Sequence, residues 1–462
     1  MERNGQSPFR GDKIDSPVVA EIPTQWMEEL TELLRIPSIS ADAEHKDDVR
    51  RAADWVAAFI RRMGGEAELV ETDTFPLVVG EVRASSGADE APTILCYGHV
   101  DVQPPAPLDA WESEPFEPEV RDGWLYARGV ADDKGQLYAL LKAAEQLAAA
   151  GELPVNIRFV CDGEEETGGH QVVEFIRADE RGADAAVIFD SAMLRPGAPV
   201  FHVATRGLIY FHVQVRTGER DLHSGVFGGA GLSATDALMQ SLRGVLPGEH
   251  GRLPEPLRAG VAPASEEELA AWRELDPGSE MLEEGGAFPS DSTAAEEFYV
   301  RTWAEPAVTV NGFVGGEPNL QKTVLPVFAE ANVSIRLAPG QDPEEIAPVF
   351  DRLLREAAPE GADVEVERWS SAEPGLIPPD APAIQLGLEA FERVVGARPL
   401  LIRVGGTLPI VPALADKEIP TIITGFDLPE GNIHSPNERL RVDHIPLAVE
   451  TGKELFRAFA QL

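Results

Sequence analysis

Hydrophobic positions near the N-terminus recur every three to four residues and predict two amphipathic helices. Trp26, Leu30, Leu33 and Leu34 form the first stripe, which Pro37 ends. Residues 52–63 repeat the pattern until Gly64-Gly65. Short apolar runs follow at 77–82, 93–98, 155–161 and 185–190, interleaved with helical stretches at 136–151 and 170–178. Strands alternating with helices predict an α/β domain with a largely parallel sheet.

The pattern changes from about Arg206 onward. Runs at 209–215, 307–313, 329–338 and 362–369 alternate between apolar and polar residues, and helices are predicted over 234–245 and near 343–357. This combination is typical of an α+β sheet with one open face. Residues 246–305 are rich in Pro, Gly, Glu and Ala, so we expect a long excursion there with a helix near 265–275.

The final part of the chain returns to buried patterns. Residues 373–382 (EPGLIPPDAP) have the composition of a linker, and apolar segments resume at 383–395, 399–404, 419–425 and 444–462. We therefore predict that residues 1–205 and 381–462 form one domain, and that residues 206–380 form a second domain inserted into it.

Composition narrows the class of protein. The 462 residues, of which 43% are hydrophobic, exceed what one core accommodates. The net charge of −40 disfavours nucleic acid and anionic membranes as partners. Cys96 and Cys161 lie in apolar runs too far apart for a cysteine-based zinc motif. Because we find neither a signal peptide nor a membrane span, we expect a cytoplasmic protein.

Acidic and histidine residues cluster where apolar runs end, which is where open α/β sheets bind ligands. His99 and Asp101 follow the run at 93–98, and Asp190 ends the run at 185–190. A histidine after a strand is usually an ordinary loop residue. An Asp two positions later, however, can accept the second N–H of the imidazole, as beside metal-bound histidines.

Two further segments each allow a structural and a functional interpretation. In ARGVADDKGQ, Asp132 or Asp133 is either the N-cap of the following helix or a functional carboxylate. In CDGEEETGG, the run Glu164, Glu165 and Glu166 is either a solvated face or a set of like charges that a cation compensates.

His434 lies in the Gly- and Asn-containing segment GNIHSPNERL. Taken alone, it reads as a surface-loop residue. Taken together, two histidines and several carboxylates at successive strand ends form a nitrogen and oxygen ligand set that suits zinc, manganese or cobalt. The set is large enough for a two-metal hydrolytic centre with a shared carboxylate.

Seven motifs in order closely resemble the aminoacylase/carboxypeptidase family of co-catalytic zinc peptidases, and most strongly its carnosinase and cytosolic nonspecific dipeptidase branch. The motifs are GHVDVQP, WESEPFEP, RGVADDKGQ, GEEETGG, DLHSGVFGG, SIRLAP and IHSPNERL. The resemblance implies an α/β catalytic domain with a mixed, mainly parallel sheet, interrupted by an inserted α+β lid domain that dimerises.

The resemblance also implies roles for residues of the first domain. It makes Glu165 the general base and Asp101 the partner of His99. It further implies two divalent ions, which are zinc by resemblance, with manganese or cobalt as alternatives. His99 and Asp190 would bind one ion, Glu166 and His434 would bind the other, and Asp132 would bridge the two. The extra acid Glu164 leaves a second register open, in which the base and the ligand each lie one residue earlier in the sequence. The Thr-Gly that follows Glu166 favours the first register.

The inserted domain supplies further implied roles. His223 would donate to the developing oxyanion in the neighbouring subunit of a homodimer. Arg336 and Thr323 would hold the substrate carboxylate, with Asn311 nearby and Thr407 contributing from the catalytic domain.

We therefore expect hydrolysis of dipeptides or short peptides that have a free C-terminal carboxylate. The nearest alternative is an N-acyl-amino-acid amidohydrolase that uses the same metals and base. A non-enzymatic metal-binding homologue is a more distant alternative, because all the implied ligands and the base are present.

Overall fold

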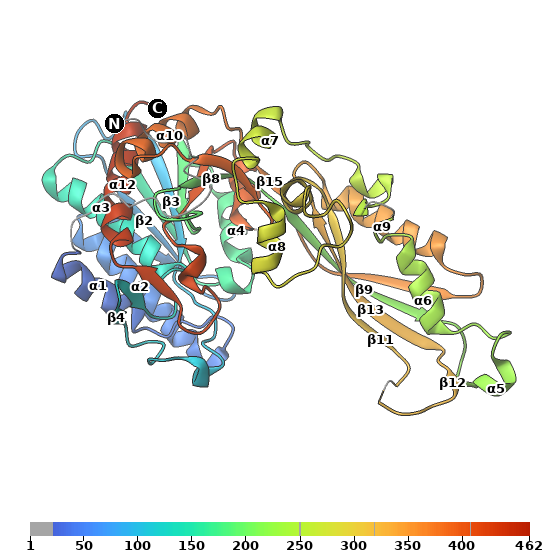
Figure 1. The fold of residues 1–462 in the computed structure, drawn as a ribbon. Coiled ribbons are helices and arrows are strands. Elements are labelled where there is room, and N and C mark those ends of the chain that lie inside the picture. Colours follow the sequence, from blue (N-terminus) through green and yellow to red (C-terminus); the bar gives the residue numbers. More distant parts are fainter. Residues whose placement is uncertain (1–21, 249–250, 318, 407) are drawn as a thin grey trace. The chain divides into compact units, whose positions relative to one another are not determined.

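The computed structural model describes residues 22–248, 251–317, 319–406 and 408–462, which divide into two compact units (Figure 1). Unit 1 comprises the described residues up to Val203 together with Ile377–Ile402 and Pro409–Leu462. Unit 2 comprises Ala204–Leu376 and Arg403–Leu408. The short segment 403–408, predicted from the sequence to belong with residues 381–462, therefore groups with unit 2.

The main sheet of unit 1 is mixed and mainly parallel, as the sequence predicts. Its six strands lie in the order β1-β2-β6-β3-β7-β17. The bounds are β1 Glu66–Val70, β2 Leu77–Val82, β6 Asn156–Asp162, β3 Thr93–His99, β7 Ala185–Phe189 and β17 Thr421–Thr424. Strands β6, β3, β7 and β17 run parallel, whereas β1 and β2 pair antiparallel at one edge.

Helices enclose this sheet. Every residue of β6 and β7 is buried, which requires cover on both faces of the sheet. Helix α2 packs on β1 and β2, α3 on β3, and α10 and α11 on β17, while α12 packs against α3 and α10. The helices of unit 1 are α1 Thr24–Leu34, α2 Lys46–Arg62, α3 Lys134–Ala150, α4 His170–Ala178, α10 Pro382–Val395, α11 Ile410–Asp416 and α12 His444–Phe459.

A second, small sheet of unit 1 joins segments far apart in the sequence. Its order is β18-β5-β4, formed by β4 Glu119–Arg121, β5 Trp124–Tyr126 and β18 Arg439–Arg441. Arg439 pairs with Tyr126 in the antiparallel register. The turn that follows β5 therefore lies beside the loop that precedes β18.

Unit 2 contains a four-stranded antiparallel sheet in the order β11-β13-β9-β14. Its strands are β9 Gly207–Arg216, β11 Ala307–Gly315, β13 Phe328–Leu337 and β14 Asp363–Ala372. Along β9 buried and half-buried residues alternate, as the sequence predicts. Helices α6 Ala234–Arg243 and α9 Pro343–Ala357 pack on the sheet (Figure 1).

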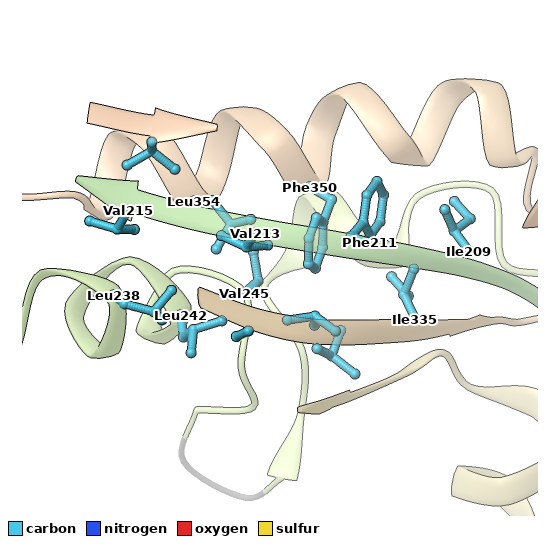
Figure 2. Close-up of a cluster of buried hydrophobic side chains, with 14 of the residues drawn as sticks. Ile209, Phe211, Val213, Val215, Leu238, Leu242, Val245, Ile335, Phe350 and Leu354 are labelled. Carbon is cyan, nitrogen blue, oxygen red and sulfur yellow. The ribbon is translucent and has the colours of Figure 1, made fainter. Parts of the chain in front are cut away.

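The core of unit 2 lies between the sheet and these helices, as Figure 2 shows. The ring of Phe211 on β9 stacks on that of Phe350 on α9, with centroids 4.4 Å apart and planes inclined by 5°. Helix α9 begins where the Asp342 side chain accepts the Glu344 N–H and Pro343 occupies the first turn. The apolar face of α9 is thus directed onto β9.

The remaining elements of unit 2 are short. The excursion at 246–305 contains α7 Glu266–Trp272, as predicted, and also α8 Gly278–Glu284 and a π-helical turn at Val300–Ala304. The chain also forms β10 Leu222–His223, α5 Ser224–Phe227 and β12 Val324–Leu325.

Three strands lie near the boundaries between the two units: β8 Val200–Thr205, β15 Gly375–Leu376 and β16 Leu400–Val404. The segment 373–382, interpreted from its composition as a linker, contains β15, which pairs antiparallel with the end of β8. Among the described residues, the structure contains no helix with both the length and the apolar character needed to cross a membrane.

Candidate metal centre

Side chains from five segments of unit 1 meet at the carboxyl edge of the main sheet. His99 ends β3, and Asp190 directly follows β7, which pairs parallel with β3. Glu165 and Glu166 lie in the short turn after β6. Asp132 comes from the turn between β5 and α3, and His434 from the loop before β18. The small sheet explains how these last two segments reach the same place.

The ligand atoms form two groups that share one carboxylate. His99, Asp132 and Asp190 form one group, and Asp132, Glu166 and His434 form the other, with ligand atoms within 4.8 Å of one another. The two oxygens of Asp132 face opposite sides, since Oδ1 lies 3.0 Å from His99 Nε2 and Oδ2 lies 2.9 Å from His434 Nε2. Asp132 is therefore the carboxylate that both candidate groups share.

Two further distances complete the groups. Asp190 Oδ1 lies 3.9 Å from His99 Nε2, and Glu166 Oε2 lies 3.2 Å from His434 Nε2. Imidazole nitrogens combined with carboxylate oxygens are the donor set that zinc, manganese and cobalt accept. The residues present thus fit a pair of divalent transition-metal ions.

The electrostatics of the centre favour added positive charge. Burial raises the pKa of Glu165 to about 8, and the carboxylates of Asp190 and Glu166 add to the shift. Burial likewise raises the pKa of Asp190 to about 7. Hydrogen bonds to Asp132 and Glu166 raise the pKa of His434 to about 10. Crowded carboxylates in a buried site thus take up protons, and divalent cations would replace those protons.

Asp101 supports the centre from behind. It is fully buried, and its oxygens accept hydrogen bonds from the Ser40 hydroxyl at 2.6 Å and from the backbone N–H groups of Glu165 at 3.2 Å and Glu166 at 3.1 Å. Its Oδ1 also lies 3.3 Å from Nδ1 of His99, which hydrogen-bonds the Asp101 carbonyl oxygen at 3.1 Å. One carboxylate therefore orients both the histidine and the turn after β6.

Two further acids of these runs, Glu164 and Asp133, lie outside the candidate ligand groups and make other contacts. Glu164 is 5% exposed and accepts hydrogen bonds from the Thr74 hydroxyl and from the Gln171 N–H, at the start of α4. Asp133 occupies the N-cap position of α3, but its side chain makes no capping hydrogen bond. Instead, its Oδ2 accepts the backbone N–H of His99 at 3.1 Å.

Gln103 is a supporting residue that the sequence analysis did not single out. Its backbone N–H donates to Oε1 of Glu166 at 3.1 Å, and its amide Nε2 donates to Oε2 at 2.8 Å. Gln103 belongs to the motif GHVDVQP, so the sequence could have indicated it as a candidate site residue. The partner of its side chain depends on the tertiary structure.

The candidate residues of the inserted domain, His223, Asn311, Thr323 and Arg336, belong to unit 2. His223 on β10 and Thr323 beside β12 are exposed neighbours, because Leu222 and His223 pair with Leu325 and Val324. The Nδ1 of His223 accepts the Gly225 N–H at 3.0 Å. The proton of a neutral His223 therefore resides on Nε2, where it is available as a donor.

Asn311 is exposed on β11 at the irregularity between Val310 and Gly312. Arg336 is half-buried on β13, and this burial lowers its pKa. Thr407 lies outside the described residues. The structure thus groups the candidate metal ligands in unit 1, whereas the described substrate-binding candidates belong to unit 2.

The chain is similar to known proteins over most of its length. A family model described as Peptidase family M20/M25/M40 matches residues 95–458. Cysteinylglycine-S-conjugate dipeptidase of Corynebacterium striatum is 31% identical over 437 residues, covering 91% of this chain and 93% of that protein. Beta-Ala-His dipeptidase of Rattus norvegicus is 28% identical over 441 residues, covering 90% and 87%.

Among solved structures, the M20 family metallo-carboxypeptidase Sso-CP2 from Sulfolobus solfataricus aligns with a TM-score of 0.82. The alignment has 26% sequence identity and covers 95% of this chain and 100% of that one.

We predict that zinc, manganese or cobalt raises the melting temperature of the metal-stripped protein. Binding to the folded state alone contributes about 2.7 kcal/mol per site at a free metal concentration of 100 times Kd. Glu166→Gln should reduce the shift, because it removes one ligand oxygen charge, whereas Glu164→Gln should leave it intact. Differential scanning calorimetry measures these shifts. An intact shift in Glu166→Gln together with a reduced shift in Glu165→Gln would favour the second register, in which Glu165 is the ligand.

Proposed function

The chain belongs to peptidase family M20/M25/M40, as its motifs predict, and from this membership we propose that it is a metal-dependent dipeptidase. The proposed reaction is hydrolysis of the amide bond of dipeptides or short peptides with a free C-terminal carboxylate. Two similar proteins are dipeptidases and a third is a metallo-carboxypeptidase, which supports this substrate class.

The observation that carries the proposal is the pair of ligand groups that share Asp132. We propose that His99 and Asp190 hold one ion, that Glu166 and His434 hold the other, and that Asp132 bridges them. Two divalent ions so held, zinc in our proposal, supply the charge that lowers the pKa of water and stabilises a developing oxyanion.

We propose Glu165 as the general base. Its carboxyl group lies among the charges of His99, Asp190 and Glu166, and its backbone is held by Asp101. We propose that Glu165 accepts a proton from the attacking water and then donates it to the leaving amine. Asp101 keeps the proton of His99 on Nδ1, so that Nε2 presents its lone pair to the ion.

Unit 2 would complete the reaction. A guanidinium such as that of Arg336 pairs with a carboxylate through two parallel hydrogen bonds, so we assign it to the C-terminal carboxylate of the substrate, with Thr323, Asn311 and Thr407 beside it. We assign His223 to the tetrahedral oxygen, because its Nε2–H is free of the Gly225 contact and donors aimed at that oxygen lower the barrier.

We further propose a cytoplasmic homodimer formed through unit 2. Both cysteines are free and buried, which is consistent with a reducing compartment. Val226, Phe227 and Leu320 are exposed apolar residues of unit 2 at 70%, 44% and 58%, and a partner subunit would cover them.

The test of function is a panel of Cys-Gly, Ala-Ala and β-Ala-His assayed against N-acetyl and N-succinyl amino acids, with each metal after chelation. We expect dipeptide hydrolysis that chelation abolishes and metal restores. Glu165→Gln should cut turnover by roughly two to four orders of magnitude with metal stoichiometry near two, because Gln cannot transfer a proton. Glu164→Gln is the matched control and should stay active. Faster hydrolysis of the N-acyl compounds would identify a deacylase instead.

Substrate recognition through Arg336 predicts a strong preference for a free carboxylate. Amidating the C-terminus of a good dipeptide should cost roughly 2–5 kcal/mol of transition-state binding, as for a lost buried charge pair. In Arg336→Met, the kcat/KM values of acid and amide should converge. Equal values in the wild-type enzyme would remove Arg336 from this role.

A donor supplied by the partner subunit predicts complementation between two inactive variants. Mixing His223→Ala with Glu165→Gln subunits in equal amounts should restore up to about a quarter of wild-type activity, because half of the statistical dimers contain one intact site. Activity is measured after subunit exchange has been verified by mass spectrometry. If exchanged dimers stay inactive, His223 serves its own subunit or has no catalytic role.

A further inference from the structure

A buried ion pair of unit 1 lies directly behind the candidate metal centre. Glu438 is 0% exposed and Arg128 is 1% exposed, with Arg128 Nη1 donating to Glu438 Oε2 at 2.7 Å. Three backbone N–H groups also donate to this carboxylate: Gly129 to Oε2 at 2.9 Å, and Ala131 and Asp132 to Oε1 at 2.9 Å and 3.2 Å. Four donors thus satisfy a charge that would otherwise be costly to bury.

The pair connects the segment that presents the shared carboxylate, Asp132, with the segment that presents His434. Arg128 and the three N–H donors belong to the turn that presents Asp132, whereas Glu438 belongs to the loop that presents His434. Arg128 Nη2 also donates to the carbonyl of Ser435, the residue after His434, at 3.2 Å. Arg128 and Glu438 each contact the opposite segment, so the ion pair holds the two segments together.

The His434 loop requires such support because of its backbone conformation. Asn432, His434 and Asn437 have φ values of 57°, 58° and 62°, in the left-handed region that residues with a Cβ rarely adopt. Such conformations persist where surrounding contacts determine them. The Arg128–Ser435 contact lies next to the strained histidine, so it holds the residue whose imidazole faces the centre.

We propose that Glu438 and Arg128 are positioning residues that fix the spacing between Asp132 and His434 and thereby set the metal affinity of the second ligand group. This inference rests on the proposed dinuclear centre. Neither residue belongs to the candidate ligand groups. Glu438 acts through the backbone N–H of Asp132, and Arg128 through the carbonyl of Ser435 next to His434. A carboxylate is required at position 438 because it accepts all four donors, whereas a Gln amide would direct N–H groups at some of them.

The test compares Glu438→Gln with Glu29→Gln as a matched control. Glu29 is also a buried acid of unit 1 and is paired with buried Lys142 on α3. Its carboxylate accepts hydrogen bonds from Gln25, Arg62 and Tyr138, none of which belongs to either ligand segment. Metal affinity is measured by competition with a chromophoric chelator, and ligand geometry by the visible spectrum of the cobalt-substituted protein.

We expect Glu438→Gln to weaken the affinity for one or both ions by roughly 10–100-fold, as for other residues that orient metal ligands, and to change the cobalt spectrum. Glu29→Gln should match the wild-type protein in both readouts. A folded Glu438→Gln with wild-type affinity and spectrum would overturn the proposal.

A second variant covers the case in which the single change prevents folding. Arg128→Gln combined with Glu438→Gln leaves no unpaired buried charge and should show the same loss of affinity. If neither variant folds while Glu29→Gln does, the pair has only a structural role and the proposal fails. Dipeptide hydrolysis by the wild-type protein is scored separately, so a metal-binding protein without that activity would refute the proposed function and not this inference.

Discussion

Repulsion among crowded, partly buried carboxylates is the constraint on which the rest of unit 1 depends. Asp132, Glu165, Glu166 and Asp190 converge at one edge of the sheet, and burial raises the pKa of Glu165 and Asp190. The protein surrounds these groups with donors, including the amide of Gln103 on Glu166. Negative charge remains in excess of these donors, and divalent cations would neutralise it. The same repulsion therefore underlies both the hydrogen-bond donors around the carboxylates and the proposed metal binding.

This constraint explains why the centre draws on both ends of the chain. The main sheet alone positions His99, Asp190 and the turn after β6. Asp132 and His434 come from segments that are held together by the small β18-β5-β4 sheet, the Arg128–Glu438 pair and the backbone hydrogen bonds to Glu438. Residues 409–462 must therefore fold against the first part of unit 1 before the group of Asp132, Glu166 and His434 is complete, although unit 2 separates them in the sequence.

Unit 2 has its own hydrophobic core, which is separate from the candidate metal centre of unit 1. The Phe211–Phe350 stack and the apolar face of β9 hold it together without any residue of the metal centre. A separate core would let the inserted domain supply the proposed substrate-binding residues, such as Arg336, without a change in the ligand geometry of unit 1. The long excursion at 246–305 adds the short helices α7 and α8 to this domain, and its Leu253 and Leu257 belong to the same core.

The sequence by itself determined the elements and the chemical inventory, because apolar periodicity and strand-end acids are local features of the chain. It predicted the α/β class, most strands of the parallel sheet and the two-faced strand β9. It did not predict the strand within residues 373–382 or the helix α8, where Pro and Gly mask weak patterns. Only the tertiary structure decided that Asp132 lies between two histidines, that Glu164 is directed toward Thr74, and that Glu438 is buried under four donors. These facts depend on contacts between residues as many as 310 positions apart, and no local pattern encodes such a distance.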